Sequence, residues 1–119
     1  MNESESGTAQ LEPIITQAAD LNPPRYEISL DGERAGFTSY VDRDQQRIFF
    51  HTEIDDRFTG RGLAGKLIRA ALTDTRSAGR RIVPICPFVA AFVQKHHDFD
   101  DLLDPVTPEA KAAVEAALS

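Results

Sequence analysis

The chain has 119 residues, of which 41% are hydrophobic and 27% charged, and its net charge is −6 at pH 7. This length and composition predict one soluble globular domain whose core needs no disulfide or metal ion. The single cysteine excludes an internal disulfide and a zinc site made of cysteines alone, and it is typical of a cytoplasmic protein. The sequence has no apolar run long enough to span a membrane and no pattern of a secretory signal. The acidic balance argues against nucleic acid as the main partner.

Basic residues gather in one part of this acidic chain. Residues 57–81 contain seven arginines or lysines and one acid, which gives this segment a net charge of +6. A basic segment in an acidic protein favours an anionic ligand that is held at one place. On charge alone, a solvent-exposed helix face explains the pattern equally well.

The N-terminal part of the chain predicts little regular structure. Residues 1–10 are polar and predict disorder. The apolar residues from Leu11 to Ala19 predict one or two helical turns, which Pro13 interrupts. The prolines of Asn22-Pro23-Pro24 end any helix there. We therefore divide the chain into a flexible extension (1–22), a folded domain (23–104) and a C-terminal helix (105–119).

The first half of the folded domain has the pattern of an antiparallel meander. Alternating apolar residues predict a strand over Arg25 to Leu30, and Asp31-Gly32 is a typical hairpin turn. Arg34 to Val41 is the second predicted strand. The β-branched and aromatic run from Arg47 to Ile54 is the third.

The pattern then changes to a strand–helix–strand unit. Apolar residues recur at helical spacing from Leu63 to Thr75, and Gly79 is a typical residue after a helix. Arg80 to Cys86 predicts a buried strand, in which Pro84 indicates the edge of a sheet. A connection of this length makes the two strands parallel. We therefore expect an α+β (α/β-like) fold with a mixed sheet and helices after the last strand.

Two further helices are predicted after that strand. Pro87 can occupy the first turn of a helix that runs to about His97. Thr107-Pro108-Glu109 combines an N-cap threonine, a proline at the first helical position and an acid in the first turn. A helix is therefore expected from there to the C-terminus.

The segment before the first long helix combines glycines with basic residues. Gly60 and Gly62 flank Arg61 where a strand turns into a helix. Glycine lets backbone N–H groups approach an anion, and a helix N-terminus adds unpaired donors, so this loop could bind phosphate. The alternative is a tight turn that needs glycine only for its shape. The run from Gly60 to Lys66 is similar to a Walker A loop, but Leu67 replaces its serine or threonine, which argues against an ATPase or GTPase.

Three motifs in order resemble those of a known family. They are His51-Thr52-Glu53-Ile54, Arg57-x-x-Gly60-x-Gly62-Leu63-Ala64 and Pro84-x-Cys86-Pro87-Phe88. The second resembles the acyl-CoA pyrophosphate loop of the GNAT superfamily of N-acetyltransferases. Together they resemble a small single-domain GNAT-like subfamily of acetyltransferases, over residues 25–103 of this chain.

The resemblance implies that acetyl-CoA is the co-substrate and lies where the two parallel strands diverge. It also gives the positive charge of residues 57–81 a purpose, because coenzyme A is strongly anionic. No metal ion is implied. The residues that would bind the cofactor are Arg57, Gly60, Arg61, Gly62, Leu63, Ala64 and Lys66.

The chemistry of acetyl transfer needs a proton donor for the departing thiolate. The common GNAT acid is a tyrosine late in the chain, whereas this sequence has only Tyr26 and Tyr40, on early strands. Cys86 is the main candidate in its place, as acid or as nucleophile, because it precedes a predicted helix. The alternative is a buried structural cysteine.

His51 and Glu53 are two residues apart on one strand and therefore share a face. Either could accept a proton from an amine, or His51 could pair with Cys86. The alternative is a histidine that only stabilises the sheet and a glutamate exposed at its edge. His96 and His97 are expected to complement the dipole at a helix end. These residues do not readily make a zinc site, so no metal is expected.

We therefore expect an acetyl-CoA-dependent N-acetyltransferase that acts on an unidentified primary amine. The alternative is a non-catalytic module that binds coenzyme A or acyl-CoA as a sensor or adaptor. A third interpretation, an interaction protein that uses its C-terminal helix, is weaker because that helix should pack on its own domain. The Asp31-Gly32 turn leaves no room for the helices between the first two strands of larger GNAT proteins, which favours an amine exposed on a protein or peptide. We expect no nucleic-acid or membrane partner, and a monomer or weak dimer.

Overall fold

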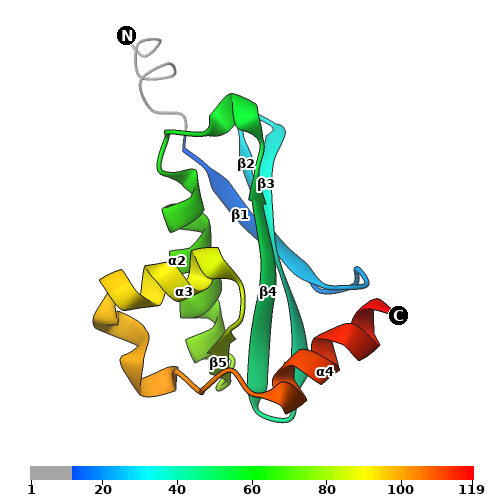
Figure 1. Ribbon diagram of the computed structural model, residues 1–119. Coiled ribbons are helices and arrows are strands. Elements are labelled where there is room, and N and C mark those ends of the chain that lie inside the picture. The colour runs from blue at the N-terminus through cyan, green and yellow to red at the C-terminus, as the bar shows by residue number, and fades with distance from the viewer. Residues whose placement is uncertain (1–11) are drawn as a thin grey trace, which may run out of the picture.

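The computed structural model describes residues 12–119, which form one sheet with helices on both faces (Figure 1). Neighbouring strands are antiparallel except the last two, which are parallel. The predicted α+β fold with a mixed sheet is therefore confirmed. The five strands lie side by side in chain order: β1 (Ile14–Ala18), β2 (Arg25–Leu30), β3 (Glu33–Arg43), β4 (Gln46–Ile54) and β5 (Arg81–Pro84).

The helices divide between the two faces of this sheet. The long helix α2 and the shorter α3 cover one face, and α4 lies against the lower part of the other (Figure 1). We call these the α2 face and the α4 face. The helical segments are η1 (Asp56–Phe58), α2 (Leu63–Ser77), α3 (Pro87–Lys95), η2 (His97–Leu102) and α4 (Pro108–Leu118).

The helical turns predicted between Leu11 and Ala19 are wrong, because this segment contains β1. All five residues of β1 pair with β2, which would otherwise be the edge of the sheet. Ile14, Ile15 and Thr16 are β-branched and favour extended backbone. Hydrogen bonding to the free edge of β2 therefore stabilises an extended conformation more than the short run of helically spaced apolar residues favours a helix. Leu11 and the disorder predicted for residues 1–10 lie outside the described residues.

The other predicted elements are confirmed, with ends that differ by a few residues. Asp31 and Gly32 have φ angles of 53° and 80°, as a two-residue hairpin turn requires. Gly79 has a φ of 74° just after α2. Pro87 begins α3, and the Thr107 side chain caps α4 by accepting a hydrogen bond from the N–H of Ala110 at 3.1 Å.

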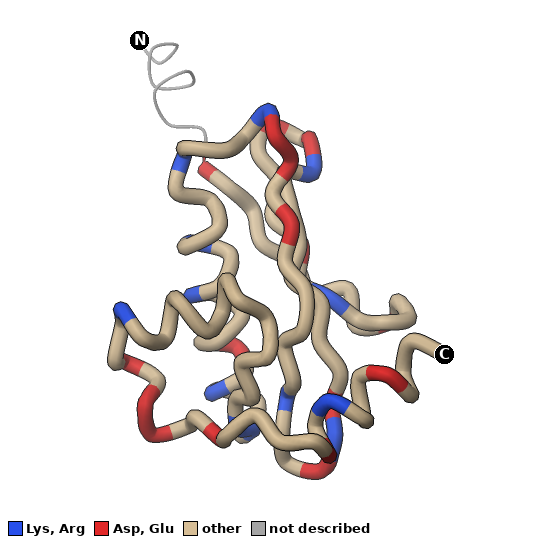
Figure 2. The backbone as a smooth tube through the Cα atoms, viewed as in Figure 1, with Lys and Arg blue, Asp and Glu red and all other residues tan. Residues whose placement is uncertain are grey.

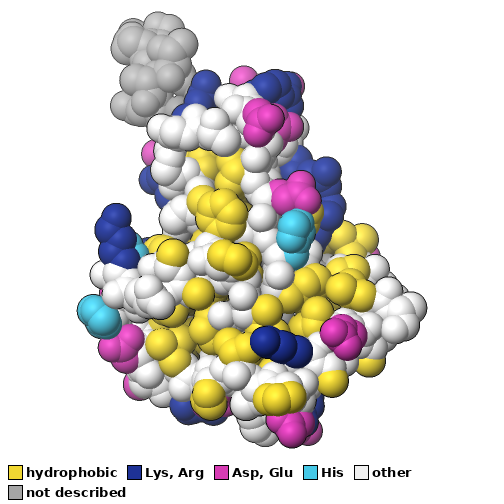
Figure 3. All heavy atoms as spheres, in the orientation of Figure 1, with side chains coloured by type: hydrophobic (Ala, Val, Ile, Leu, Met, Phe, Trp, Pro, Cys, Tyr) yellow, Lys and Arg dark blue, Asp and Glu magenta, His cyan; other side chains and the backbone are white. Residues whose placement is uncertain are grey.

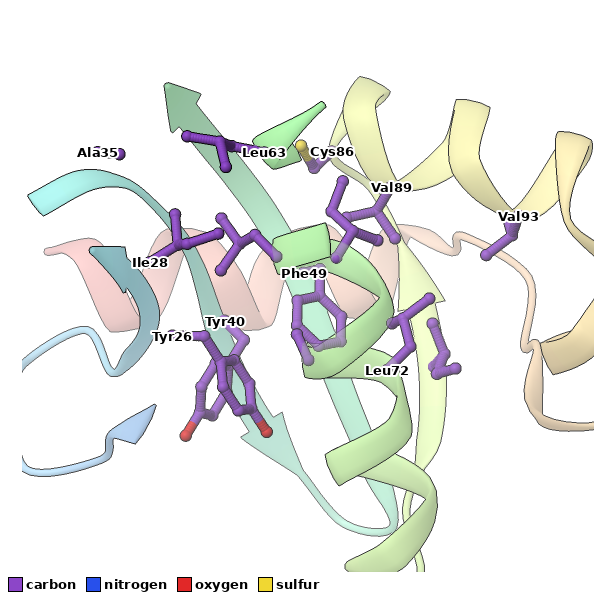
Figure 4. Packing of buried hydrophobic residues seen from close by; sticks show 14 of the residues in the cluster. Tyr26, Ile28, Ala35, Tyr40, Phe49, Leu63, Leu72, Cys86, Val89 and Val93 are labelled. Atoms are coloured by element: carbon purple, nitrogen blue, oxygen red, sulfur yellow. The ribbon is translucent and has the colours of Figure 1, made fainter. Parts of the chain in front are cut away.

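The main core lies between the sheet and α2 (Figure 4). The apolar face predicted for this helix points inward and packs on Ile28 and Phe49, both fully buried. A smaller cluster on the α4 face includes Ile48 and Val114. Ile48 and Phe49 thus serve opposite faces, as neighbours in a strand do. The buried residues of α2 are Leu63, Leu67, Ile68, Ala71, Leu72 and Thr75.

A polar cluster stands inside the core, beside the last turns of α2. Arg47 donates hydrogen bonds to both carboxylate oxygens of Asp42, at 2.8 and 3.0 Å, and to the hydroxyl of Tyr26 at 2.6 Å. Its guanidinium lies 4.4 Å from the ring centre of Tyr40. The Tyr26 hydroxyl donates to Asp74 at 2.6 Å. Burial, together with Asp74, raises the pKa of Tyr26 above its usual range, so this phenol is held protonated in the structure.

Candidate active site

Strands β4 and β5 pair only over the first part of β4. The pairing runs from Gln46↔Arg81 to Phe49↔Pro84. There the Phe49 carbonyl accepts hydrogen bonds from the N–H groups of both Ile85 and Cys86, at 3.1 and 2.9 Å, as the chain turns away into α3. β4 continues to Ile54, so its last five residues extend beyond the pairing with β5.

The open edge of β4 carries backbone groups that face away from β3. The N–H of Asp55 donates to the Ala35 carbonyl at 2.7 Å, which makes these two residues a hydrogen-bonded pair. Pairs of this kind alternate along an antiparallel ladder. Thr52 and Ile54 therefore direct their N–H and C=O groups toward the side where β5 is missing. A ligand with amide groups could bond to this edge as a strand would.

A cavity of about 250 Å³ lies between the end of β4, the glycine loop and the start of α3. Four of the seven predicted cofactor-binding residues line it, namely Gly60, Gly62, Leu63 and Ala64. The other lining residues are Ile54, Phe58, Thr59 and Phe88. The predicted basic residues Arg57, Arg61 and Lys66 do not line this cavity.

The loop presents the start of α2 without a side-chain cap. Gly60 and Gly62 have φ angles of 81° and 73°, a region that other residues rarely adopt. No heavy atom lies within 4 Å of a Cβ added at either position, so the glycines are needed here for backbone geometry. Gly62 is the N-cap residue, has no side chain to bond the first N–H groups, and the first turn has no acid. These donors remain available to an anion.

Most of the basic side chains of residues 57–81 form ion pairs in the fold. Figure 2 shows where the basic and acidic residues lie along the backbone. Arg57 contacts Asp55 and Glu33 at 3.2 and 3.5 Å, and the Asp55 carboxylate raises the pKa of its guanidinium. For most of residues 57–81, a solvent-exposed helix face therefore explains the basic residues better than an anionic ligand does. Within residues 12–119, Arg61 and Lys66 have no ion pair, and both lie next to the glycine loop. The remaining pairs are Arg69 with Asp98, Arg76 with Asp101, Arg80 with Asp42 and Arg81 with Asp104.

Cys86 is buried on the α2 face at the start of α3 (Figure 4). Its Sγ donates a hydrogen bond to Oγ1 of Thr52 at 3.1 Å. The Thr52 hydroxyl in turn lies 2.9 Å from that of Thr38. Three buried side chains, one at the N-cap of α3, one in β4 and one in β3, thus form one hydrogen-bonded chain beneath the open edge of β4.

His51 and Glu53 lie on the α4 face, on the other side of β4. His51 Nε2 and Glu53 Oε2 are 2.7 Å apart, and both side chains are more than half exposed. Since Cys86 contacts Thr52, which points to the opposite face, the structure does not bring His51 and Cys86 together. The pairing of His51 with Cys86 is therefore wrong, whereas the contact between His51 and Glu53 follows from their spacing.

The structure places the remaining polar candidates outside this region. Tyr26 and Tyr40 belong to the polar cluster around Arg47, beside the end of α2 that is farther from the loop. His97 contacts Asp100 at 3.0 Å after α3. Among residues 12–119, no group of three His, Cys, Asp or Glu side chains could hold a metal ion. No helix in the described part of the chain could cross a membrane.

The comparisons agree with this architecture. A model of the family described as GCN5-related N-acetyl-transferase matches residues 25–102. The chain belongs to this family. The residues matched by the family model include β2 to β4, the glycine loop, β5 and α3. The elements around the candidate site are therefore those of the family's acetyltransferase fold.

A solved structure shows the same fold. It is the solution structure of a GCN5-like protein from Staphylococcus aureus, with a TM-score of 0.58 and 19% sequence identity, and the match covers 84% of this chain and 94% of that one. Among curated proteins, the comparison found no relative by sequence. At this level of sequence identity, the structural likeness supports the fold of our chain and says nothing of its substrate.

Sequence reasoning missed Thr52, Thr38 and Phe88 as site residues. Thr52 lies between His51 and Glu53, so the alternation of a strand already places it on the opposite face. Thr38 is its partner across the ladder of β3 and β4. That pairing depends on the register, which no local pattern reveals. Phe88 follows Pro87 at the start of α3 and is about half exposed.

Proposed function

We propose that this protein transfers an acetyl group from acetyl-CoA to a primary amine on a protein or peptide. The observation that carries the proposal is the coincidence of two features at one cavity. β4 extends past its pairing with β5 there, and the uncapped N-terminus of α2 opens into the same space. A long ligand with phosphates at one end and amides along its arm suits both features.

Different residues at and near the cavity bind different parts of acetyl-CoA in this proposal. Backbone N–H groups of Gly62, Leu63 and Ala64 face the pyrophosphate, and Arg61 and Lys66 add positive charge nearby. The free backbone groups of Thr52 and Ile54 bond to the amide groups of the arm. Acetyl-CoA supplies the acetyl group as an activated thioester.

Residues on the two sides of β4 carry out different proton transfers in the proposed reaction. As the carbon–nitrogen bond forms and the carbon–sulfur bond breaks, His51 accepts the proton that the amine loses, with Glu53 stabilising the imidazolium. Cys86 donates its proton to the departing sulfur from the α2 face. The Thr52 hydroxyl then turns to donate to the Cys86 sulfur, and Thr38 can donate to Thr52 in the same sense. The proton held by His51 passes through solvent and restores the Cys86 thiol.

A second candidate function is a module that binds coenzyme A without turnover. The observation that favours it is the position of both tyrosines in the Arg47 cluster, because the cavity is then lined by no tyrosine, the common acid of the superfamily. Such a module would bind coenzyme A and acetyl-CoA with similar affinity.

Calorimetric titration with acetyl-CoA, with ATP as the control anion, tests the proposal. We expect saturable binding of acetyl-CoA alone at micromolar strength, about −8 kcal/mol. Cys86→Ala and His51→Ala should keep this binding and lose turnover of an amine. Unchanged turnover in both variants would exclude these catalytic roles. Equal binding of ATP would show that the glycines only shape a turn and that the loop is not specific for acetyl-CoA.

A further inference from the structure

Strand β1 is at the edge of the sheet, and among residues 12–119 it has a neighbouring strand on one side only (Figure 1). It contains no proline and no charged residue, the residue types that commonly protect an edge strand from pairing with another chain. Its first residue, Ile14, is 64% exposed. Figure 3 shows apolar side chains over α3 and α4 as well, but Phe88 of α3 already lines the cavity at the glycine loop. The edge of β1 has no part in the proposed reaction.

The register of the sheet determines which backbone groups of β1 face outward. The N–H of Tyr40 donates to the Pro24 carbonyl at 3.0 Å, so these two residues form a hydrogen-bonded pair between β2 and β3. Residues of β2 alternate from there between bonding to β3 and bonding to β1, and the register makes Thr16 one of the β1 residues bonded to β2. The N–H and C=O groups of the residues on either side of it, Ile15 and Gln17, therefore point away from the sheet.

This edge is complementary to a second copy of itself. When two β1 strands run antiparallel about a two-fold axis at Thr16, Ile15 of each copy lies opposite Gln17 of the other. Each of these pairs exchanges two backbone hydrogen bonds, so the outward groups of Ile15 and Gln17 all find partners. Thr16 meets its own counterpart at the axis.

The flank of α2 beside β1 has the same self-complementary pattern. Lys66, Ala70 and Asp74 are four residues apart and form one row on this helix. The row has a cation one turn before Ala70 and an anion one turn after it. A two-fold axis near Ala70 therefore places Lys66 of each copy opposite Asp74 of the other. Asp74 is half exposed and lies 3.6 Å from the buried Arg47, so its carboxylate is also open to a cation from outside.

The centres of the two patterns lie at one place. A second cavity of about 250 Å³ is lined by Thr16 and its two neighbours in β1 and by Ala70 and Asp74 of α2. One axis can therefore pass close to both centres. The Ile15 side chain of the second copy would lie over this cavity, because it is opposite Gln17, which lines the cavity on the α2 face.

We propose that two copies of this chain pair through β1 and this flank of α2, so that the sheet continues across a two-fold axis. The contact consists of a five-residue strand and one helix row, so the dimer is weak and reversible. The inference does not depend on the proposed function, since β1 lines neither the cavity at the glycine loop nor the path of the transferred protons.

The first test measures the mass of the protein in solution. Sedimentation equilibrium is run at physiological salt, because each copy carries a net charge of −6 and the general repulsion must be screened. We expect the average mass to rise from one chain toward two as the concentration approaches about 1 mM. A single-chain mass throughout would overturn the proposal.

A variant at the axis tests the place of the contact. Thr16→Lys puts two ammonium groups opposite each other and should raise the dissociation constant of the dimer about 5-fold. Val106→Lys is the matched control, because it adds the same charge at a position that is 41% exposed and lies outside β1 and α2. Equal dissociation constants for the two variants would overturn pairing through β1. Circular dichroism verifies that both variants are folded.

Hydrogen exchange measured by NMR tests the register. The amides of Ile15 and Gln17 should exchange more slowly as the protein concentration rises, because their N–H groups are bonded only in the dimer. The amide of Thr16 is bonded to β2 in each copy and should not change. Slowing at another edge of the sheet, or at Thr16 alone, would overturn the proposed pairing.

A charge reversal tests the contribution of α2. Lys66→Glu turns the attraction to Asp74 of the second copy into repulsion and should raise the dissociation constant about 5-fold. Arg69→Glu makes the same change on the other flank of α2, where Arg69 pairs with Asp98 at 3.3 Å, and should alter the constant by less than about 2-fold. Equal effects of the two variants would overturn an axis at Ala70.

Discussion

The two ends of β4 differ in how completely their polar groups are satisfied. At the closed end, β4 pairs on both sides, and Arg47 is buried with hydrogen bonds to Asp42 and Tyr26. At the open end, β5 has turned away, Ser39 is buried without a partner among residues 12–119, and His51 faces solvent. One half of this strand thus contributes stability, and the other half carries the groups that we propose for ligand binding.

Substitution at the closed end should have the largest effect, and it should act on stability. Arg47→Ala leaves Asp42 and Tyr26 without their shared partner inside the core, and we expect the free energy of unfolding to fall by about 3 kcal/mol. Urea unfolding measures this loss. Arg34→Ala is the control, since that arginine is half exposed and pairs at 3.6 Å. Equal stability of the two variants would contradict the contrast between the ends.

Substitution in the glycine loop should act on ligand binding. Gly62→Val forces a β-branched residue to a φ of 73° at the start of α2 and obstructs the cavity, so we expect at least a ~10-fold loss of acetyl-CoA affinity by calorimetry. Gly79→Val is a matched control, because it imposes the same strain at a φ of 74° just beyond the other end of the helix. If both variants lose affinity equally, the loop acts only through the stability of α2.

The hydroxyl chain behind Cys86 should affect turnover more than binding. Thr52→Val removes the group that accepts the thiol hydrogen bond, and we expect kcat to fall about 5-fold with acetyl-CoA affinity unchanged. Thr52→Ser keeps the hydroxyl and should restore most of the rate. Steady-state kinetics of the two variants provide the measurement. A serine variant as slow as the valine variant would assign Thr52 to packing alone.

The smallest expected effect concerns the basic segment, where charges with and without partners can be compared. Arg61→Gln should weaken acetyl-CoA binding about 3-fold at low salt, because this guanidinium is near the loop and has no ion pair within residues 12–119. Arg76→Gln should change the affinity by less than 2-fold, since Asp101 at 3.0 Å already neutralises it. The comparison is made by calorimetry, and an equal loss in both variants would show a general field effect.

The amino-acid sequence by itself determined the features that depend on near neighbours. The apolar spacing of α2, the Asp31-Gly32 hairpin and the cap at Thr107 all follow from residues within a few positions of one another. The glycine loop and the contact of His51 with Glu53 were also predictable, because strand alternation and a strand-to-helix turn are local. The motif order around them indicated the family.

Only the tertiary structure decided the features that depend on pairing between distant segments. β1 exists because β2 offers a free edge, and the bulge at Phe50 arises from the register of β3 against β4. That bulge puts His51 and Phe50 on one face, while Cys86 lies on the other with Thr52 and Thr38. Most of the basic residues that are clustered in the sequence likewise form ion pairs in the fold. Several of their partners are acids more than twenty residues away, such as Asp101 for Arg76. Register and long-range charge pairing are properties of the packed chain, since they depend on which segments meet in the fold.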